Sequence, residues 1–487
     1  MQKYPITATL IAVIIIVLAS PVSRAQPNQQ PLKFGKDKTF KIAQFTDIHW
    51  DNNIAASCEK TLDLMKTIIN IEQPDLVVLT GDIVTVSPAR EGWRRIGELL
   101  ALYGKPWAVV LGNHDDETDM TRSEIFSYLA ELPGFIGEVG TVSGVGNYIK
   151  PVLSSDEKAN SSLLYFIDSH AYTDMEGVGY YDWIKFDQIQ WYRQQSALFT
   201  AENNKVPLPA LAFFHIPTRE YNEVYNLSTS VGLKNEDVAS AAINPGMTAA
   251  FIEAGDVMAT FVGHDHVNNY IGIYHGLALA YGQKTGFNSY GDLPQGARII
   301  QLFEGKRSFN TWIRTYDGES YHYNYPFGQS FKNDGFTFRK SMEINDAVQG
   351  LKFRYYEGSF KSVEDFQRLE PLKTGLIEAP EVNQIREKSN FGYVFEGFIH
   401  IPATGLYRFY TSSDDGSTLW IDDEKLVDND GLHGHKKVES VTALEQGFHS
   451  VKICYFNGTG GQFLELGYSS IHQQEEKIPA SWFFWSR

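Results

Sequence analysis

The stretch DLVVLTGD, residues 75–82, places an unbroken apolar run directly before a glycine and an aspartate. A short continuous apolar run predicts a strand that is buried on both faces. Similar runs precede and follow it, FKIAQF and PWAVVL, and segments of helical spacing separate the three, TLDLMKTIINIE and REGWRRIGELLALYG. The sequence therefore predicts an α/β arrangement in which strands and helices alternate.

This alternation continues through the first half of the chain. Further strands are expected at LLYFI, ALAFF and VMATFV, and further helices at TRSEIFSYLAEL, FDQIQWYRQQSALF and GMTAAFIEA. From Leu277 onward the runs predict strands only, LALAYG, ARIIQLF and FNTWIRTY. Patterns of this kind form layered sandwiches, with function at the carboxyl ends of the strands.

The second half of the chain has a different pattern. A tyrosine-rich segment, YHYNYPFGQSFKNDG, carries turn residues and no clear period, and past Val348 short strands alternate with turns. That alternation predicts an all-β sandwich. We therefore predict a first domain over residues 39–325, a linker over 326–347 and a second domain over 348–487.

Length, charge and cysteine content limit the class of protein. A chain of 487 residues suits two domains. Its formal net charge of −17 argues against a nucleic-acid backbone as partner, because phosphate contacts there need clustered lysine and arginine. A small phosphorylated substrate is still compatible, since metal ions can attract it locally. The two cysteines, Cys58 and Cys454, are expected to be buried free thiols.

The N-terminus has the pattern of a secretory signal peptide. The apolar run ITATLIAVIIIVLA follows Lys3, and the small residues Ser23 and Ala25 precede an expected cleavage after Ala25. The run is too short for a stable membrane span, which disfavours the alternative of an uncleaved anchor. We expect residues 1–25 to be removed and the protein to be secreted or periplasmic.

Polar side chains follow five of the apolar runs in the first domain. They belong to Asp47 and His49, Asp82, Asn113 to Asp115, His215, and His264 to His266. A lone histidine or aspartate at a strand end is more often a turn former, but here five strand ends carry such residues to one edge. Imidazole nitrogen and carboxylate oxygen suit borderline divalent metals, and a carboxylate can bridge two ions that clamp a phosphoryl group. The pattern predicts a dinuclear metal centre.

These motifs resemble those of the calcineurin-like metallophosphoesterases, over about residues 40–314. The resemblance implies a four-layer α/β/β/α sandwich and two divalent metal ions, with Mn, Fe and Zn all compatible. The implied ligands of the first ion are Asp47, His49, Asp82 and His266, and those that complete the second site are Asn113, His215 and His264. Asp82 is then the bridge between the two ions.

The same resemblance implies the reaction, hydrolysis of a phosphomonoester or phosphodiester by attack of metal-bound hydroxide. His114 would protonate the leaving oxygen or stabilise charge on the phosphoryl group, without binding metal. Asp115 or Asp116 would orient His114. Because side chains alternate along an extended segment, the two histidines of His264-Asp265-His266 point to the metals, while Asp265 points away and braces the loop.

The fuller motifs PWAVVLGNHDDE, FFHIPTREY and GHDHVNNYIG are similar to the purple-acid-phosphatase-like branch of that family. Two positions depart from the purple enzymes themselves. Thr85 stands where they have a tyrosine ligand, and His49 stands where they have glycine. His49 can fill the coordination position that the tyrosine leaves, so we expect a colourless or pale protein.

The second half resembles the protective-antigen-type (PA-14) β-sandwich, most specifically in GLYRFYTSSDDGSTLWID, residues 405–422. In some members of that family the aspartates matching Asp414 and Asp415 hold calcium, which binds sugar hydroxyls. The alternative is that these two aspartates only cap a turn. The expected whole is a phosphoesterase targeted by a carbohydrate-binding domain. The alternative is an inactive surface or glycan-binding protein whose phosphoesterase domain is vestigial.

Overall fold

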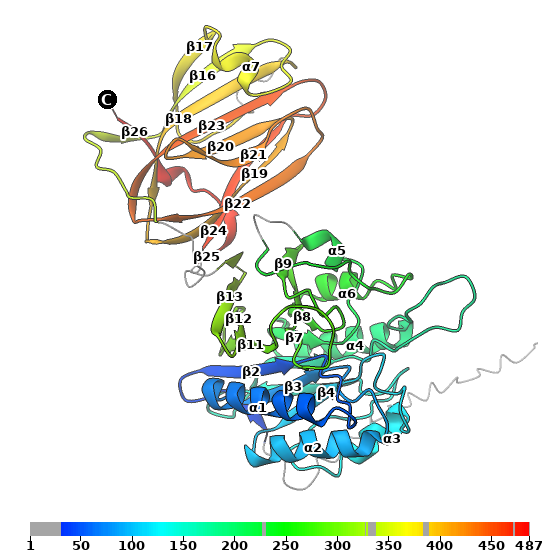
Figure 1. Ribbon diagram of the computed structural model, residues 1–487. Helices are drawn as coiled ribbons and strands as arrows, with labels where there is room; N and C mark the ends of the chain where they lie inside the picture. Colours follow the sequence, from blue (N-terminus) through cyan, green and yellow to red (C-terminus); the bar gives the residue numbers. More distant parts are fainter. Residues whose placement is uncertain are drawn as a thin grey trace, which may run out of the picture.

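The structure is a computed structural model that describes residues 31–225, 230–326, 328–329, 338–382, 389–470 and 473–486. The predicted signal peptide, residues 1–25, lies outside these ranges, as do residues 327 and 330–337 of the predicted linker. Figure 1 shows an α/β domain, coloured blue to green, followed by a β-rich domain, coloured yellow to red. Across the described ranges, no helix combines the length and apolar character needed to span a membrane.

The first sheet of the α/β domain has the strand order β14-β13-β12-β11-β2-β3-β4. Its strands are β2 (Thr39–Phe45), β3 (Leu76–Thr80), β4 (Trp107–Val110), β11 (Gly296–Phe303), β12 (Phe309–Thr315), β13 (Gly318–Tyr325) and β14 (Gly328–Gln329). Strands β2, β3 and β4 run parallel, so their carboxyl ends meet at one edge. The later strands add antiparallel hairpins, as their short connections require.

The second sheet has the order β1-β5-β6-β7-β8-β10-β9. Its strands are β1 (Leu32–Lys33), β5 (Tyr148–Leu153), β6 (Asn160–Phe166), β7 (Ala210–Phe213), β8 (Val257–Val262), β9 (Ile271–Tyr274) and β10 (Leu277–Tyr281). Strands β6, β7, β8 and β10 are parallel. All residues of β7 and β8 are buried, as their unbroken apolar runs predict.

Helices cover the outer face of each sheet. Those on the first sheet are α1 (Ala55–Glu72), α2 (Ala89–Leu102) and α3 (Arg122–Leu129), and those on the second are α4 (Phe186–Glu202), α5 (Tyr221–Val224) and α6 (Met247–Ala254). Thr121 caps α3 in a capping box with Glu124. One apolar cluster joins α1 to α3 with the facing sides of both sheets, and another lies between the second sheet and α4 to α6. The predicted four-layer α/β/β/α class is confirmed.

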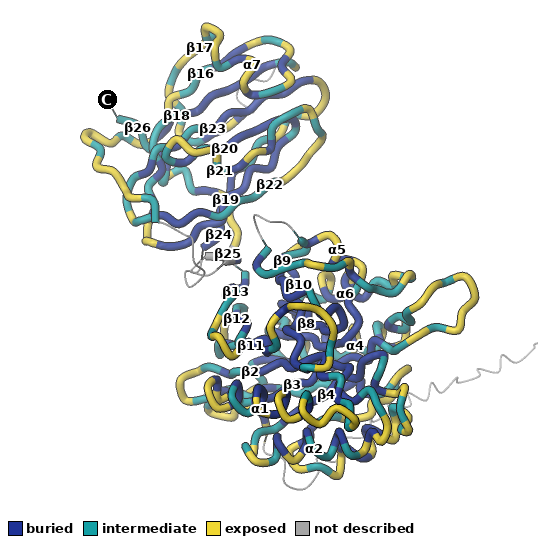
Figure 2. Tube along the Cα trace, in the orientation of Figure 1, coloured by how far each residue is buried: buried dark blue, intermediate teal, exposed yellow. Residues whose placement is uncertain are grey.

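The second domain consists of two sheets around one apolar core, as predicted. The larger contains β15 (Ala347–Gln349), β16 (Leu351–Glu357), β17 (Lys373–Ile377), β18 (Phe391–Ile401), β20 (Ser417–Ile421), β21 (Glu424–Asn429), β23 (Gly447–Asn457) and β26 (Phe483–Ser486). The smaller contains β19 (Gly405–Asp414), β22 (Lys436–Leu444), β24 (Phe463–Ser470) and β25 (Gln473–Lys477). A short helix, α7 (Glu364–Gln367), and a 3₁₀ turn, η1 (Ala480–Trp482), complete the domain. Figure 2 shows its strands as mostly buried and its loops as exposed.

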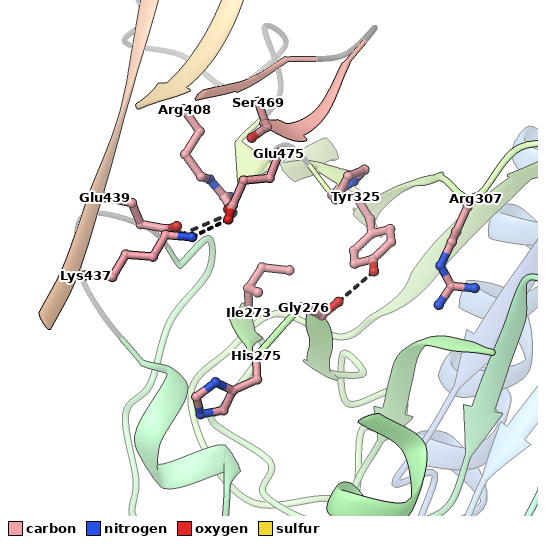
Figure 3. Close-up of a pocket in the computed structure, with 11 residues that line it drawn as sticks. Ile273, His275, Gly276, Arg307, Tyr325, Arg408, Lys437, Glu439, Ser469 and Glu475 are labelled. Atoms are coloured by element: carbon pink, nitrogen blue, oxygen red, sulfur yellow. Dashed lines mark hydrogen bonds and ion pairs between the residues drawn. The ribbon is translucent and has the colours of Figure 1, made fainter. Parts of the chain in front are cut away.

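The junction between the domains differs in detail from the predicted linker. Arg339 N donates to Ala443 O at 3.0 Å, and Met342 N donates to Phe448 O at 2.9 Å, so these linker residues pair with the second domain. A cavity of about 530 Å³ lies between the domains, with Arg307 on one side and Arg408 on the other (Figure 3). Both cysteines are free and buried, as expected.

Candidate metal centre

The predicted ligands follow the carboxyl ends of β2, β3, β4, β7 and β8, so both sheets contribute to one edge. Gln44 joins the two sheets there, because its Nε2 donates to Thr80 Oγ1 at 2.9 Å and to Val262 O at 3.0 Å. Thr46 Oγ1 also donates to Thr80 O at 3.0 Å. Loops that are far apart in sequence are thereby held side by side.

The backbone at this edge is strained. Asp47, His49, Asp82 and His264 all have positive φ, at 52°, 47°, 51° and 80°. Left-handed conformations are costly for residues other than glycine and cluster at functional sites. Glycine is required next to them for a different reason: a Cβ on Gly112 would lie 2.2 Å from Asp82 Oδ1.

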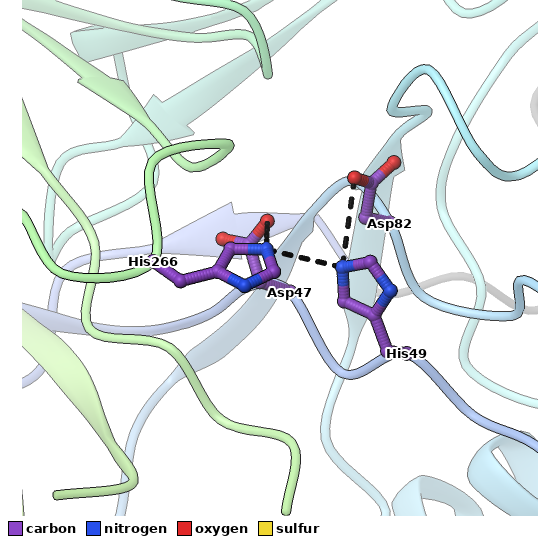
Figure 4. Close-up of side chains that lie close together, drawn as sticks. All are labelled: Asp47, His49, Asp82 and His266. Carbon is purple, nitrogen blue, oxygen red and sulfur yellow. Dashed lines mark hydrogen bonds and ion pairs between the residues drawn. The ribbon is translucent and has the colours of Figure 1, made fainter. Parts of the chain in front are cut away.

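A first group of side chains consists of Asp47, His49, Asp82 and His266, whose ligand atoms lie within 4.8 Å of one another (Figure 4). His266 Nε2 is 3.4 Å from Asp47 Oδ1, and His49 Nε2 is 3.7 Å from Asp82 Oδ2. The two histidine Nε2 atoms are 3.1 Å apart. Two nitrogens and two carboxylates that converge in this way can hold one divalent ion.

A second group consists of Asp82, His215 and His264, so Asp82 belongs to both groups. His215 Nδ1 donates to Thr80 O at 2.7 Å, which leaves Nε2 facing Asp82 Oδ2 at 3.2 Å. His264 Nδ1 is 3.3 Å from His215 Nε2. The shared carboxylate has the position that a bridge between two ions needs.

Asn113 and His264 each have a buried polar atom without a hydrogen-bond partner in the described part of the chain. Asn113 Nδ2 donates to Tyr172 Oη at 2.9 Å, but its Oδ1 is buried with no hydrogen-bond partner in the described part of the chain. The same holds for His264 Nε2. Because buried polar atoms are nearly always bonded, these atoms together with the convergent donor set fit bound cations. The chain therefore has the residues that two divalent ions require.

Burial and mutual charge set the protonation of these groups. Burial would raise the pKa of Asp82, but the charge of His215 and a hydrogen bond to it hold that pKa well below its usual range. Burial opposes protonation of His215 as well, yet the Asp82 charge raises the pKa of His215 to about 9. Burial lowers the pKa of His49 to about 4 and that of His264 to about 3. Near neutral pH the last two rings are therefore neutral, which is the form that binds metal.

His114 lies beside the first group at the open side of the site. Its side chain is 36% exposed, its ring centroid is 5.6 Å from that of His49, and its backbone N donates to Asp82 Oδ1 at 2.9 Å. Its Nδ1 is 2.7 Å from Glu117 Oε2. Glu117 is thus the group that holds the His114 ring, and the remaining Nε2 is left for other partners.

The predicted orienting role of Asp115 or Asp116 is therefore corrected. Asp115 is fully buried, and its carboxylate accepts N–H groups from Asp82, Ile83 and Val84 at 2.8–3.1 Å and from Gly112 at 2.7 Å. Asp116 lies 3.4 Å from Arg122 Nη1. Asp115 acts on the backbone that carries Asp82 rather than on His114. Burial, together with the Asp82 charge, raises the pKa of Asp115 to about 6.

Sequence reasoning missed Glu117, although a local signal existed. Glu117 N donates to His114 O at 3.2 Å, so a turn brings the carboxylate back to the ring three residues away. The expectation for Asp265 agrees with the structure, because its carboxylate accepts from Tyr281 Oη and from Ala239 N, at 2.5 and 3.3 Å. Metal binding itself remains a prediction for all seven ligands.

Asp414 and Asp415 lie at the end of β19 in the second domain. Asp415 is buried, and its two carboxylate oxygens accept from His433 N at 2.9 Å and from Gly458 N at 2.8 Å. Within the described ranges, groups of three or more candidate ligands occur only at the first-domain edge. The calcium expectation for these two aspartates therefore remains a prediction.

Comparison with known proteins defines the class. Residues 40–268 match the family model of the calcineurin-like phosphoesterases, and residues 350–482 match that of the PA14 domain. The chain is 32% identical over 327 residues to "Probable inactive purple acid phosphatase 29" of Arabidopsis thaliana, which covers 60% of this chain and 84% of that one. The chain belongs to the calcineurin-like phosphoesterases, with purple-acid-phosphatase-like relatives, and it carries a PA14 domain.

Two further relatives match one or the other domain. "Phosphatase DCR2" of Saccharomyces cerevisiae is 30% identical over 342 residues, which cover 60% of this chain and 56% of that one. "Beta-hexosaminidase" of Porphyromonas gingivalis is 29% identical over 133 residues, which cover 26% of this chain and 17% of that one. The aligned length for the "Beta-hexosaminidase" is close to the length of the PA14 match in this chain.

Proposed function

We propose that this protein is an exported dinuclear-metal phosphoesterase that hydrolyses phosphomonoesters or phosphodiesters. The observation that carries the proposal is the presence of two ligand groups that share Asp82. Asp47, His49 and His266 would hold one ion with Asp82, and His215, His264 and Asn113 would hold the other. Two bound divalent ions supply Lewis acidity toward the phosphoryl oxygens and lower the pKa of a bound water.

The remaining residues act on protons and on position. With Nδ1–H donating to Glu117, His114 can donate a proton from Nε2 to the leaving oxygen of the ester. Asp115 fixes the backbone N–H groups from Asp82 to Val84, which keeps the Asp82 carboxylate in place. His49 stands close to Asp82 while Thr85 offers no phenolate, which supports a protein without the purple colour.

Carbohydrate is the ligand we propose for the second domain, with calcium at Asp414 and Asp415. Support comes from the match of residues 350–482 to the PA14 domain family. Export rests on the signal-peptide pattern of residues 1–25. In this proposal the second domain brings the phosphoesterase to a glycan-bearing surface.

A second candidate function is an inactive surface protein that binds glycans. The word "inactive" in the names of three plant relatives favours it. The candidate ligands favour an active enzyme instead. Decay of a catalytic site removes ligands, whereas both ligand groups that share Asp82 are complete in this chain.

One pair of measurements separates the two functions. The purified full chain is analysed for bound metal and assayed with p-nitrophenyl phosphate and bis(p-nitrophenyl) phosphate. We expect about two divalent ions per chain, a colourless or pale solution, and hydrolysis of at least one ester. A protein that takes up no metal and hydrolyses neither ester, but binds glycans on an array, would overturn the proposal in favour of the second function.

A further inference from the structure

A narrow hairpin of residues 171–182 stands at the rim of the metal centre. Its two arms are held by backbone hydrogen bonds, Asp182 N to Ala171 O at 3.1 Å and Thr173 N to Tyr180 O at 3.2 Å. Tyr172 and Tyr181 face each other across the arms as an isolated antiparallel bridge. The hairpin therefore presents three tyrosines, Tyr172, Tyr180 and Tyr181, as one aromatic cluster.

The two inner tyrosines contact the candidate ligands. Tyr172 Oη accepts from Asn113 Nδ2 at 2.9 Å, and its ring centroid is 6.3 Å from that of His114. The Tyr181 ring lies edge-on to His264 at 4.6 Å. Through these contacts the two rings order Asn113 and His264 and cover them from water.

Among the described residues, the ring contacts of Tyr180 are with Tyr172 and Tyr181 and not with a candidate ligand. Tyr180 is 75% exposed, and its ring centroid lies 5.7 Å from those of both Tyr172 and Tyr181. It therefore extends the aromatic surface from Tyr172, whose ring lies 6.3 Å from that of His114, out to solvent. Met175, on the same hairpin, is 53% exposed. Exposed aromatic rings beside a reaction centre are suited to stacking against a flat or apolar group.

The charges around this surface disfavour a highly anionic partner. Glu117 lies 2.7 Å from the His114 ring, and the hairpin carries Asp174 and Glu176. Among the neighbouring cations, Lys185 pairs with Asp182 and Arg122 with Asp168, while Arg219 donates to the backbone oxygen of Ala242 at 2.8 Å. Because Glu117, Asp174 and Glu176 contribute three carboxylates, an uncharged leaving group is favoured over one that carries a second phosphate.

We propose that Tyr172, Tyr180 and Tyr181 form a subsite for an uncharged aromatic leaving group of the phosphoester, with Tyr180 as the stacking ring. This inference rests on the proposed hydrolytic function and adds the class of substrate. His114 and the tyrosine cluster lie on the same side, so the group that leaves with the proton from His114 is the one that stacks.

The test compares leaving groups of similar acidity but different shape. Ethyl phosphate and 2-phenylethyl phosphate both release a primary alcohol, so a difference in kcat/KM reports contact with the phenyl ring. For the metal-loaded full chain we expect about tenfold higher kcat/KM for the phenylethyl ester. Equal values for the two esters in an active enzyme overturn the subsite and leave the hydrolytic function standing. A preference for glucose 6-phosphate over the phenylethyl ester overturns the aromatic assignment.

Variants assign the effect to Tyr180. Tyr180→Ala is expected to bring the phenylethyl-to-ethyl ratio close to unity, while Tyr180→Phe keeps it, because the ring and not the hydroxyl stacks. As Tyr180 is largely exposed, neither change removes buried contacts. Leu102→Ala is the matched control, since Leu102 is 79% exposed at the opposite end of the domain, where α2 ends. An unchanged ratio in Tyr180→Ala contradicts the proposal.

A binding measurement separates failure of the subsite from failure of hydrolysis. 2-Phenylethylphosphonate and ethylphosphonate cannot be hydrolysed, and calorimetry on the metal-loaded chain gives their Kd values. The subsite predicts about tenfold tighter binding of the phenylethyl compound even in a protein without turnover. Equal Kd values overturn the subsite regardless of activity, whereas a difference in Kd without hydrolysis overturns only the proposed function.

Discussion

The metal-facing edge of the first domain and the Asp414–Asp415 loop of the second both place carboxylates at strand ends, but the partners differ. At the edge, Asp82 Oδ2 faces the ring nitrogens of His49 and His215 at 3.7 and 3.2 Å. In the second domain both oxygens of Asp415 accept backbone N–H groups. A carboxylate oxygen that faces ring nitrogens fits a cation site, while a carboxylate whose two oxygens both accept backbone N–H groups holds a loop together.

The same contrast occurs inside the first domain, between Asp82 and Asp115. Both are buried, and Asp115 Oδ2 accepts from Asp82 N at 3.0 Å. Asp115 accepts backbone N–H groups there. Asp82 accepts one such group, from His114, with Oδ1, and its Oδ2 faces the histidine rings. Residue type and motif therefore do not distinguish a metal ligand from a residue that holds the backbone. The atoms that each carboxylate contacts do distinguish them.

Asp82→Ala should have the largest effect, because it removes the one carboxylate that belongs to both ligand groups. We expect loss of both ions and a fall in turnover of at least about a hundredfold. Metal content is measured by mass spectrometry and turnover with the dye ester that the wild type hydrolyses. Two ions per chain in this variant would refute the bridging role.

His114→Ala should reduce turnover by about 10²- to 10⁴-fold while metal content stays nearly intact, because His114 acts on a proton and binds no ion. The loss should be greater for ethyl phosphate than for p-nitrophenyl phosphate, since a good leaving group needs less protonation. Metal analysis and kcat for the two esters check this. Loss of metal would instead place His114 among the ligands.

Glu117→Gln should have a smaller effect of the same kind, about tenfold in kcat, because it weakens the hold on His114 without removing the ring. The loss should again be larger for the poorer leaving group, which a purely structural role would not produce. Glu131→Gln is the matched control, since Glu131 is 68% exposed in a surface pair with Arg90. Equal losses for both esters would contradict a positioning role.

Asp415→Asn should destabilise the second domain by about 1–3 kcal/mol, because an amide cannot accept both N–H groups. Ester hydrolysis should not change. Thermal unfolding of the full chain measures this, with the exposed Asp423→Asn as control. Added calcium tests whether Asp415 also binds a cation. A calcium-dependent rise in melting temperature that Asp415→Asn abolishes supports the calcium proposal, and no response to calcium limits Asp415 to bracing.

The sequence predicted the fold because its signals are local. The buried runs at β3, β7 and β8 and the helical spacing between them depend only on neighbouring residues. The expected helix over 61–72 begins earlier, at Ala55, since its first turns carry few apolar residues to mark them. The partners of the linker residues Arg339 and Met342 could not be predicted, because they lie more than a hundred residues away in the sequence.

At the candidate site the sequence pattern predicts which residues gather, whereas the contacts of each residue depend on the tertiary structure. The five ligand-bearing strands run parallel within their sheets, so their ends bring Asp47, Asp82 and the histidines to one edge. The partner of a side chain depends on loop paths and backbone N–H directions, which have no local signature. For this reason the sequence did not reveal that Asp115 holds the Asp82 loop or that Glu117 holds His114. It also did not reveal that Tyr180 lies exposed beside Tyr172 and Tyr181.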